Sequence, residues 1–335
     1  MAKTGPTYPT YCDSLYDKDL PARFRTPTLP LVINPKLHVD LRGFNDLAMS
    51  ASAQISENTF QAVRKNMKGK IWIVDLRQES HGFIDGVAID WLEGKNEGNK
   101  GLNLEEMQHK ERTLLEELQK NPTVSIHEII SMDSLGAEIA VTRKHEVRVQ
   151  KVETEAELAK RLGVEYIRIP VSDRGFPSAE QVDRFLNLPQ DAWLHFHCMG
   201  GVGRASTLML MLDMLHHGNA FSLETYLNRQ YWLLGKETFL YGEPDVKWPL
   251  WMHIEIRSKN DFLERFHCFA SDAKRGNLTW SQWNEALKKP PILVNAPVYS
   301  PARDAFGGFP AAASAAVDAS SAAVAMVEPA RSPTP

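Results

Sequence analysis

The stretch WLHFHCMGGVGRAST, residues 193–207, carries most of the information about the fold. The run AWLHFHC, residues 192–198, is almost continuously apolar, which is typical of a strand buried on both faces of a parallel sheet. RASTLMLMLDML, residues 204–215, is apolar on all sides and predicts a central buried helix. The glycines between them permit a tight loop whose backbone N–H groups converge on one spot, as in anion-binding nests. The stretch therefore predicts a strand, an anion-binding loop and a buried helix in succession.

This loop has the spacing Cys-x5-Arg, from Cys198 to Arg204. It lacks the lysine of a Walker A loop, and Ser206 occupies the place where a dinucleotide fingerprint starting at Gly201 would need a glycine. Backbone amides, the helix N-terminus and the guanidinium all favour a thiolate at Cys198. The same groups hold phosphate oxygens, and Arg204 can grip two of them. The loop residues predicted to bind substrate are Met199, Gly200, Gly201, Val202 and Gly203. The pattern predicts nucleophilic phosphoryl transfer through a phosphocysteine.

A general acid is needed to protonate the leaving oxygen in such a reaction. Asp173 in IPVSDRGFP follows a predicted strand, VEYIRIPVSD, and precedes the strand that leads to Cys198. Because the carboxyl ends of parallel strands meet at one edge of a sheet, Asp173 is the best-placed carboxylate. The alternative is an aspartate that only caps a turn.

The 335 residues alternate between strand and helix patterns, which predicts an α/β fold with a mostly parallel central sheet flanked by helices. Glycine- and asparagine-rich residues 82–103 are interpreted as loop, residues 104–120 as an amphipathic helix, and TVSIHEII and HEVRVQKV as antiparallel strands. Three parts are expected: an extended N-terminal arm at 1–35, a core at 36–289 with a β-rich insertion at about 100–152, and a disordered Ala/Pro/Ser-rich tail at 290–335.

Composition excludes several classes of protein. The net charge of −4 argues against general nucleic-acid binding. The three cysteines, without CxxC spacing, argue against a disulfide framework or a four-cysteine zinc site. No apolar stretch is long enough to span a membrane, and the N-terminus lacks a Sec signal peptide. We expect a cytoplasmic protein, or one exported without a Sec signal and delivered into a host cell; the sequence leaves its oligomeric state open.

HCMGGVGR, together with IVDLRQESHGF and RIPVSD, resembles the bacterial protein-tyrosine-phosphatase-like inositol polyphosphatases, or cysteine phytases, from about Leu20 to Trp283. The resemblance implies a protein tyrosine phosphatase-like core with a small inserted β-barrel. It also implies stepwise hydrolysis of myo-inositol hexakisphosphate without a metal or other cofactor. The implied roles are nucleophile for Cys198, phosphate clamp for Arg204 and general acid for Asp173.

The resemblance extends to further residues. It implies substrate contacts for Arg25, in ARFRTP, and for Lys259, in RSKNDFLERF, where the alternative is a solvated surface charge. Arg174 follows the acid where the family commonly has His, and it is also expected at the substrate. Ala205 replaces the usual Ser or Thr after the loop arginine, which predicts slow breakdown of the phosphoenzyme.

A second set of family residues is expected to act beneath the loop or departs from the family pattern. Arg77, Glu79 and His81 are expected to form scaffolding beneath the loop. Met252 stands where the family often carries a lysine.

Other interpretations of the loop remain open at this point. Cys198 could be a structural cysteine, His195 and His197 could join it in a metal site, or the loop could serve an arsenate reductase. His195 and His197 share one face of the strand while Cys198 points the other way, which disfavours a metal site there. A protein-tyrosine or phosphoinositide phosphatase and a catalytically inactive phosphate-binding module are the alternative functions.

Overall fold

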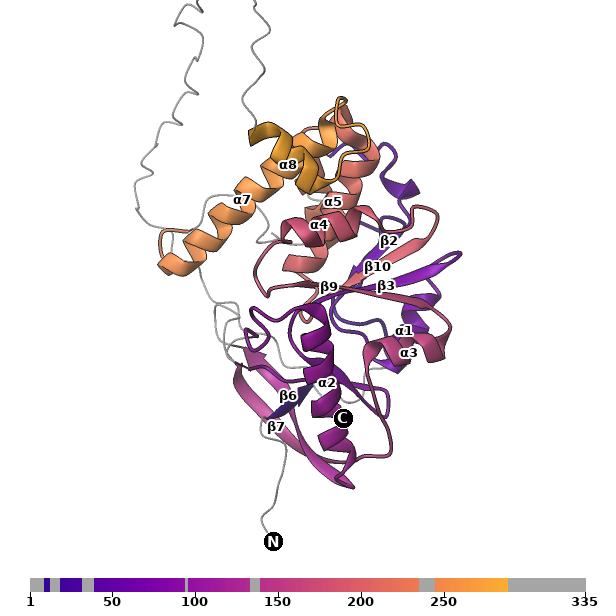
Figure 1. The fold of residues 1–335 in the computed structure, drawn as a ribbon. Helices are drawn as coiled ribbons and strands as arrows, with labels where there is room; N and C mark the ends of the chain where they lie inside the picture. The colour runs from indigo at the N-terminus through magenta and orange to yellow at the C-terminus, as the bar shows by residue number, and fades with distance from the viewer. Residues whose placement is uncertain are drawn as a thin grey trace, which may run out of the picture. The chain divides into compact units, whose positions relative to one another are not determined.

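Four parallel strands form the central sheet of the computed structural model (Figure 1). Their spatial order is β2, β10, β3, β9. The bounds are β2 Met49–Ser52, β3 Ile71–Arg77, β9 Glu165–Val171 and β10 Trp193–His197. Every residue of β10 is buried, as its apolar run predicted, because strands lie on both of its edges and helices on both faces. The predicted mostly parallel α/β sheet is confirmed.

The structure describes residues 9–12, 19–31, 39–93, 96–132, 139–234 and 245–288. All of them belong to one compact unit that ends at residue 289. The predicted tail at 290–335 lies outside the described residues, as do residues 1–8, 13–18 and 32–35 of the predicted arm.

Helices cover both faces of the central sheet (Figure 1). One face packs against α4 to α8 in a single apolar core, and the other packs against α1 and α3. The bounds are α1 Glu57–Arg64, α3 Glu155–Leu162, α4 Ala179–Leu186, α5 Gly203–His217, α6 Leu223–Leu234, α7 Leu250–Ser271 and α8 Trp280–Lys288, with short 3₁₀ turns at Phe44–Asp46 and Gly218–Ala220. The predicted central helix is α5, and its apolar residues are buried around nearly its whole circumference.

A second sheet has the order β7, β6, β1, β5, β4, β8. Its strands are β1 Thr10–Cys12, β4 His81–Ile84, β5 Val87–Asp90, β6 Thr123–Met132, β7 Ile139–Arg148 and β8 Val152–Glu153. Helix α2, Leu104–Gln119, packs on it through a separate apolar core. β6 and β7 pair antiparallel, as predicted.

Residues 82–103 are not all loop, because β4 and β5 form a hairpin there around Asp85 and Gly86, both in the left-handed region at φ 50° and 82°. Among the described strands no pairing joins β7 to β8, so the barrel implied by the resemblance stays a prediction.

Candidate active site

The loop after β10 curls into the predicted nest at the start of α5. The backbone N–H of Gly201 donates to Cys198 Sγ over 3.2 Å, which folds the loop back on its first residue. Gly201 has φ 67°, and a Cβ there would lie 2.3 Å from the backbone nitrogen of Ala53, so this position requires glycine. Cys198 is the first residue of the loop, directly after β10, and it is buried, with 3% of its surface exposed.

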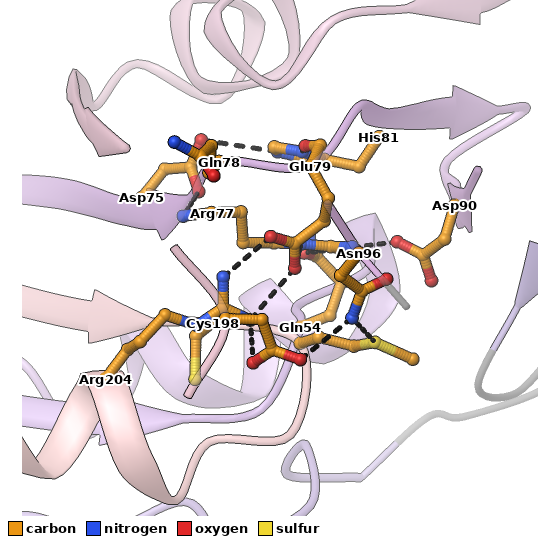
Figure 2. Close-up of polar contacts among 12 residues, drawn as sticks. Gln54, Asp75, Arg77, Gln78, Glu79, His81, Asp90, Asn96, Cys198 and Arg204 are labelled. Atoms are coloured by element: carbon orange, nitrogen blue, oxygen red, sulfur yellow. Dashed lines mark hydrogen bonds and ion pairs between the residues drawn. The ribbon is translucent and has the colours of Figure 1, made fainter. Parts of the chain in front are cut away.

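Arg204 is held in place by a buried carboxylate, Glu79 (Figure 2). Two guanidinium nitrogens of Arg204 donate to the two Glu79 oxygens over 2.6 and 2.9 Å. Arg77, behind Glu79, donates to the same carboxylate over 2.9 Å and ion-pairs with Asp90. Burial would raise the pKa of Glu79, but Arg204 and Arg77 together hold it far below its usual range. Arg204 is therefore fixed by a charged, bidentate partner on the side away from solvent.

Asp173 lies just beyond the end of β9, beside the guanidinium of Arg204. One carboxylate oxygen is 3.1 Å from Arg204 Nη2, and the other accepts a hydrogen bond from Asn96 Nδ2 over 3.0 Å. The Asp173 side chain is 29% exposed, so it can face a ligand in the nest. The structure thus brings Cys198, Arg204 and Asp173 together at the carboxyl edge of the sheet.

The predicted substrate-binding cations lie at different depths. Arg25 is only 3% exposed and donates to Gly201 O and Ser206 Oγ, behind the loop. Lys259 on α7 is 5% exposed; burial lowers its pKa, while Glu255, Asp173 and Cys198 oppose that shift. Arg174 adopts a left-handed φ of 60° and stacks over the Trp251 ring at 5.1 Å. Substrate contact by these three cations stays a prediction.

Several contributors were not anticipated from the sequence. Asn96, in the left-handed region at φ 69°, binds Asp173 and also approaches Met199 Sδ at 3.7 Å. Arg23 donates to Gly200 O over 2.6 Å. Neither residue belongs to a sequence pattern that indicates a site. Asn96 lies in a glycine- and asparagine-rich segment, and Arg23 stands two residues before Arg25. The predicted scaffolding residues Arg77 and Glu79 do lie beneath the loop.

A network of buried charges continues below Glu79. His81 lies 3.0 Å from Glu155 and 3.3 Å from Asp75, and Arg168 binds Glu111 over 2.9 Å. Burial alone would lower the pKa of His81, yet Asp75 and Glu111 raise it to about 10. The imidazole is therefore a cation at neutral pH and compensates carboxylates on β3, α2 and α3.

One group of three side chains within the described ranges has the spacing of metal ligands, namely Asp75, Glu155 and His197, within 4.8 Å of one another. The carboxylates of this group already face the cations His81 and Arg168. Their donor set is thus used in ion pairs, and the group fits a structural network better than a metal centre. The metal site of His195, His197 and Cys198 weighed from the sequence is also disfavoured, because His195 lies between the hydroxyls of Ser50 and Ser52.

The part of the chain that the structure describes holds no helix long and apolar enough to cross a bilayer.

Comparison with known proteins agrees with this geometry. The PTP-like phytase family, described by the words "Inositol hexakisphosphate", matches residues 74–216. The effector protein hopD2 of Pseudomonas syringae pv. tomato is 27% identical over an alignment of 265 residues, which covers 75% of this chain and 54% of hopD2.

Two solved structures are also similar. The PTP-like myo-inositol phosphatase from Mitsuokella multacida, in complex with myo-inositol-(1,3,4,5)-tetrakisphosphate, has a TM-score of 0.72 and 31% identity, covering 84% of this chain and 50% of that one. A PTP-like phytase from Bdellovibrio bacteriovorus has a TM-score of 0.61 and 27% identity, covering 84% and 97%. This chain therefore spans about half the length of hopD2 and of the Mitsuokella protein.

Proposed function

The chain belongs to the PTP-like phytase family of the protein tyrosine phosphatase superfamily, and from that premise we propose that it hydrolyses phosphomonoesters of myo-inositol hexakisphosphate and lower inositol polyphosphates. The observation that carries the proposal is the convergence on one loop of a thiol, a guanidinium locked by a buried carboxylate and an aspartate 3.1 Å from that guanidinium. The proposed reaction needs no metal or other cofactor, because side chains of this site supply the nucleophile, the stabilisation of charge on phosphate and the proton transfers.

In the first step the Cys198 thiolate attacks phosphorus, and the bond from phosphorus to the ester oxygen breaks. The loop amides and Arg204 hold the remaining phosphate oxygens and stabilise the charge that develops on them. Protonated Asp173 donates its proton to the leaving inositol oxygen. The products of this step are a free hydroxyl and a phosphocysteine.

In the second step water attacks the phosphocysteine. The Asp173 carboxylate left by the first step accepts a proton from the water, the sulfur–phosphorus bond breaks, and inorganic phosphate and the thiolate are released. Arg204 has a nitrogen near Asp173 Oδ1 before substrate binds, so a phosphate oxygen replaces that carboxylate when the nest fills. The same aspartate thus serves as the acid in one step and as the base in the next.

A substrate with several phosphates needs cations around the nest as well as within it. Arg174 and Lys259 flank Asp173, one on the loop after β9 and one on α7. Arg23 reaches the outer side of the loop at Gly200 and has an exposed guanidinium contact. These three cations support a polyanionic substrate, and the similarity to a protein solved with an inositol tetrakisphosphate agrees with that choice.

The test is release of phosphate from inositol hexakisphosphate in the presence of chelator, with the products identified by chromatography. We expect activity that chelator does not change and that Cys198→Ser abolishes. Release from phosphotyrosine peptides or phosphoinositides alone would replace the proposal with the alternative phosphatases. No release from any phosphomonoester would indicate an inactive phosphate-binding module.

The similarity to an effector protein supports a second proposal, delivery of this chain into a host cell. A reporter fused to the chain and assayed inside co-cultured host cells tests it, and a signal confined to the bacterial cytoplasm would contradict it.

A further inference from the structure

Three consecutive carbonyl groups of the loop are bound by donors from outside the loop. Met199 O accepts from the backbone N–H of Gln54 over 3.1 Å. Gly200 O accepts from Arg23 over 2.6 Å, and Gly201 O from Arg25 over 2.8 Å. Carbonyl oxygens held by donors outside the loop do not compete with a phosphate for its centre. An anion there requires N–H groups instead, and the Gly201 N–H already points to Cys198 Sγ.

Arg25 is the most deeply placed of these donors. Its backbone pairs with Ala51 at the edge of β2 through two hydrogen bonds of 2.8 and 2.9 Å. Its guanidinium spans from Gly201 O to Ser206 Oγ, which lies 2.7 Å from Nη2 in the first turn of α5. Arg25 therefore joins the central sheet, the middle of the loop and the start of the helix.

The hydroxyl next to the loop arginine is absent in this chain. Position 205 is alanine, fully buried, and the hydroxyl one residue later, on Ser206, is bound to Arg25. Burial lowers the pKa of Arg25 to about 10, and Cys198 opposes that shift. Arg25 is thus a cation at neutral pH, and it binds the carbonyl oxygen of Gly201, whose backbone N–H donates to Cys198 Sγ over 3.2 Å.

We propose that Arg25 is a positioning residue that holds the loop open to phosphate and supplies, from behind the loop, the stabilisation of the Cys198 thiolate that a hydroxyl at position 205 would otherwise give. The proposal rests on the phosphocysteine chemistry proposed above. It gives Arg25 a role in the free enzyme, whereas the family resemblance implies contact with substrate.

The two roles differ in an experiment without substrate. In a Cys268→Ser background, which removes the exposed thiol, the rate of Cys198 alkylation by iodoacetamide at pH 6 reports the thiolate directly; Cys12 is fully buried. We expect Arg25→Gln to slow alkylation by about tenfold or more, which corresponds to a loss of about 1.4 kcal/mol in stabilisation of the thiolate relative to the thiol. Arg25→Lys keeps the charge and should recover part of that rate. Ser206→Ala frees one end of the guanidinium and should slow alkylation by a smaller factor. The matched control is Arg112→Gln, because the Arg112 side chain is 40% exposed on α2 and its loss should leave the rate unchanged.

An unchanged alkylation rate in folded Arg25→Gln, together with a raised KM for inositol hexakisphosphate, would overturn the proposal in favour of substrate contact. If Arg25→Gln does not fold, as judged by circular dichroism, Arg25→Lys and Ser206→Ala decide, and wild-type alkylation in both would overturn it. Alkylation does not depend on the identity of the substrate. A wild-type enzyme that alkylates rapidly but releases no phosphate would therefore refute the proposed function and leave the role of Arg25 standing.

Discussion

Replacing Glu79 by glutamine tests whether Arg204, the proposed phosphate clamp, depends on a buried charge. Glu79 is 1% exposed, and its carboxylate lies 2.6 and 2.9 Å from Arg204 and 2.9 Å from Arg77. Glutamine keeps the shape but removes the charge, so two buried guanidinium groups lose their shared partner. Breaking a buried ion pair in this way costs about 3–5 kcal/mol of unfolding free energy. Because Arg204 also loses its bidentate anchor, we expect kcat to fall by about 100-fold, the cost of a displacement of about 1 Å in a catalytic group.

An exposed pair of similar geometry provides the control. Arg112 binds Glu157 through two hydrogen bonds of 2.8 and 3.0 Å, but the two side chains are 40% and 46% exposed. Arg112→Gln should therefore cost no more than about 1 kcal/mol and leave kcat unchanged. The contrast between the two variants isolates the effect of burial, since both break a bidentate arginine–glutamate pair.

Urea denaturation followed by circular dichroism gives the free energies, and phosphate release gives kcat. The reasoning fails if Glu79→Gln is as stable as the Arg112→Gln control. It fails equally if the variant loses stability but keeps wild-type kcat, because Glu79 would then support the fold without orienting Arg204.

Three further predictions follow from individual contacts. Gly201→Ala should destabilise the fold by about 1–3 kcal/mol or more and abolish activity, because the added Cβ would lie 2.3 Å from the backbone nitrogen of Ala53. Gly203→Ala should leave the melting temperature nearly unchanged, because a Cβ there would have no neighbouring atom within 4 Å. Equal melting temperatures for the two variants would refute the steric argument. Ala205→Thr should speed phosphoenzyme breakdown, measured by quenched-flow trapping, and no gain in rate would count against a missing hydroxyl as the cause of slow turnover. The free energy of unfolding should peak near pH 6.5, the ordinary pKa of histidine. Burial and then His197 lower the pKa of His195 to about 3, so stability falls as the pH drops below 6.5. The pKa of His81 is raised to about 10, so stability also falls as the pH rises from 6.5 toward that value. His195→Asn should flatten the loss between pH 6.5 and 4.5 in pH-dependent urea titrations, and an unchanged slope there would contradict the assignment.

Local sequence patterns were sufficient to predict the loop and the elements beside it. The buried strand β10, the nest and the buried helix α5 are adjacent in sequence. The spacing of apolar residues and the glycine content therefore define them without long-range information. Thr154 and Ser178 begin α3 and α4 through capping boxes, and Gly163 ends α3 in the left-handed conformation. These are signals carried by a few neighbouring residues.

The β4–β5 hairpin shows that an available signal can still be missed. Asp85–Gly86 stands between two apolar runs, which is a strong short-range hairpin signal, but the glycines and asparagines that follow make the composition of the whole segment typical of a loop. β1 is a different case. Its three residues are too few for any periodicity, and they form a strand because β5 and β6 supply partners on both sides.

Arg77 and Glu79 were predicted as scaffolding only through the family resemblance, and the contacts made by Asn96 and Arg25 were not predicted because their partners are far away in sequence. Asn96 meets an aspartate 77 residues later, and Arg25 a glycine 176 residues later. An isolated arginine or asparagine carries no local pattern that distinguishes a buried contact from a solvated one. Chemistry at the loop is thus readable from sequence, while the residues that orient it are defined by tertiary packing.

The ion pairs below the loop connect it to the second sheet. Arg204 binds Glu79, Glu79 binds Arg77, and Arg77 binds Asp90 on β5. The α2 side chain Glu111 reaches Arg168 on β9 in the same way, so the second sheet and its helix supply carboxylates that buried arginines of the central sheet require. Buried pairs of this kind add little net stability compared with apolar packing, but removing one partner leaves a costly uncompensated charge. The second sheet therefore supports the candidate active site, because without Asp90 the arginine that holds Glu79 in place would lose one of its two carboxylate partners.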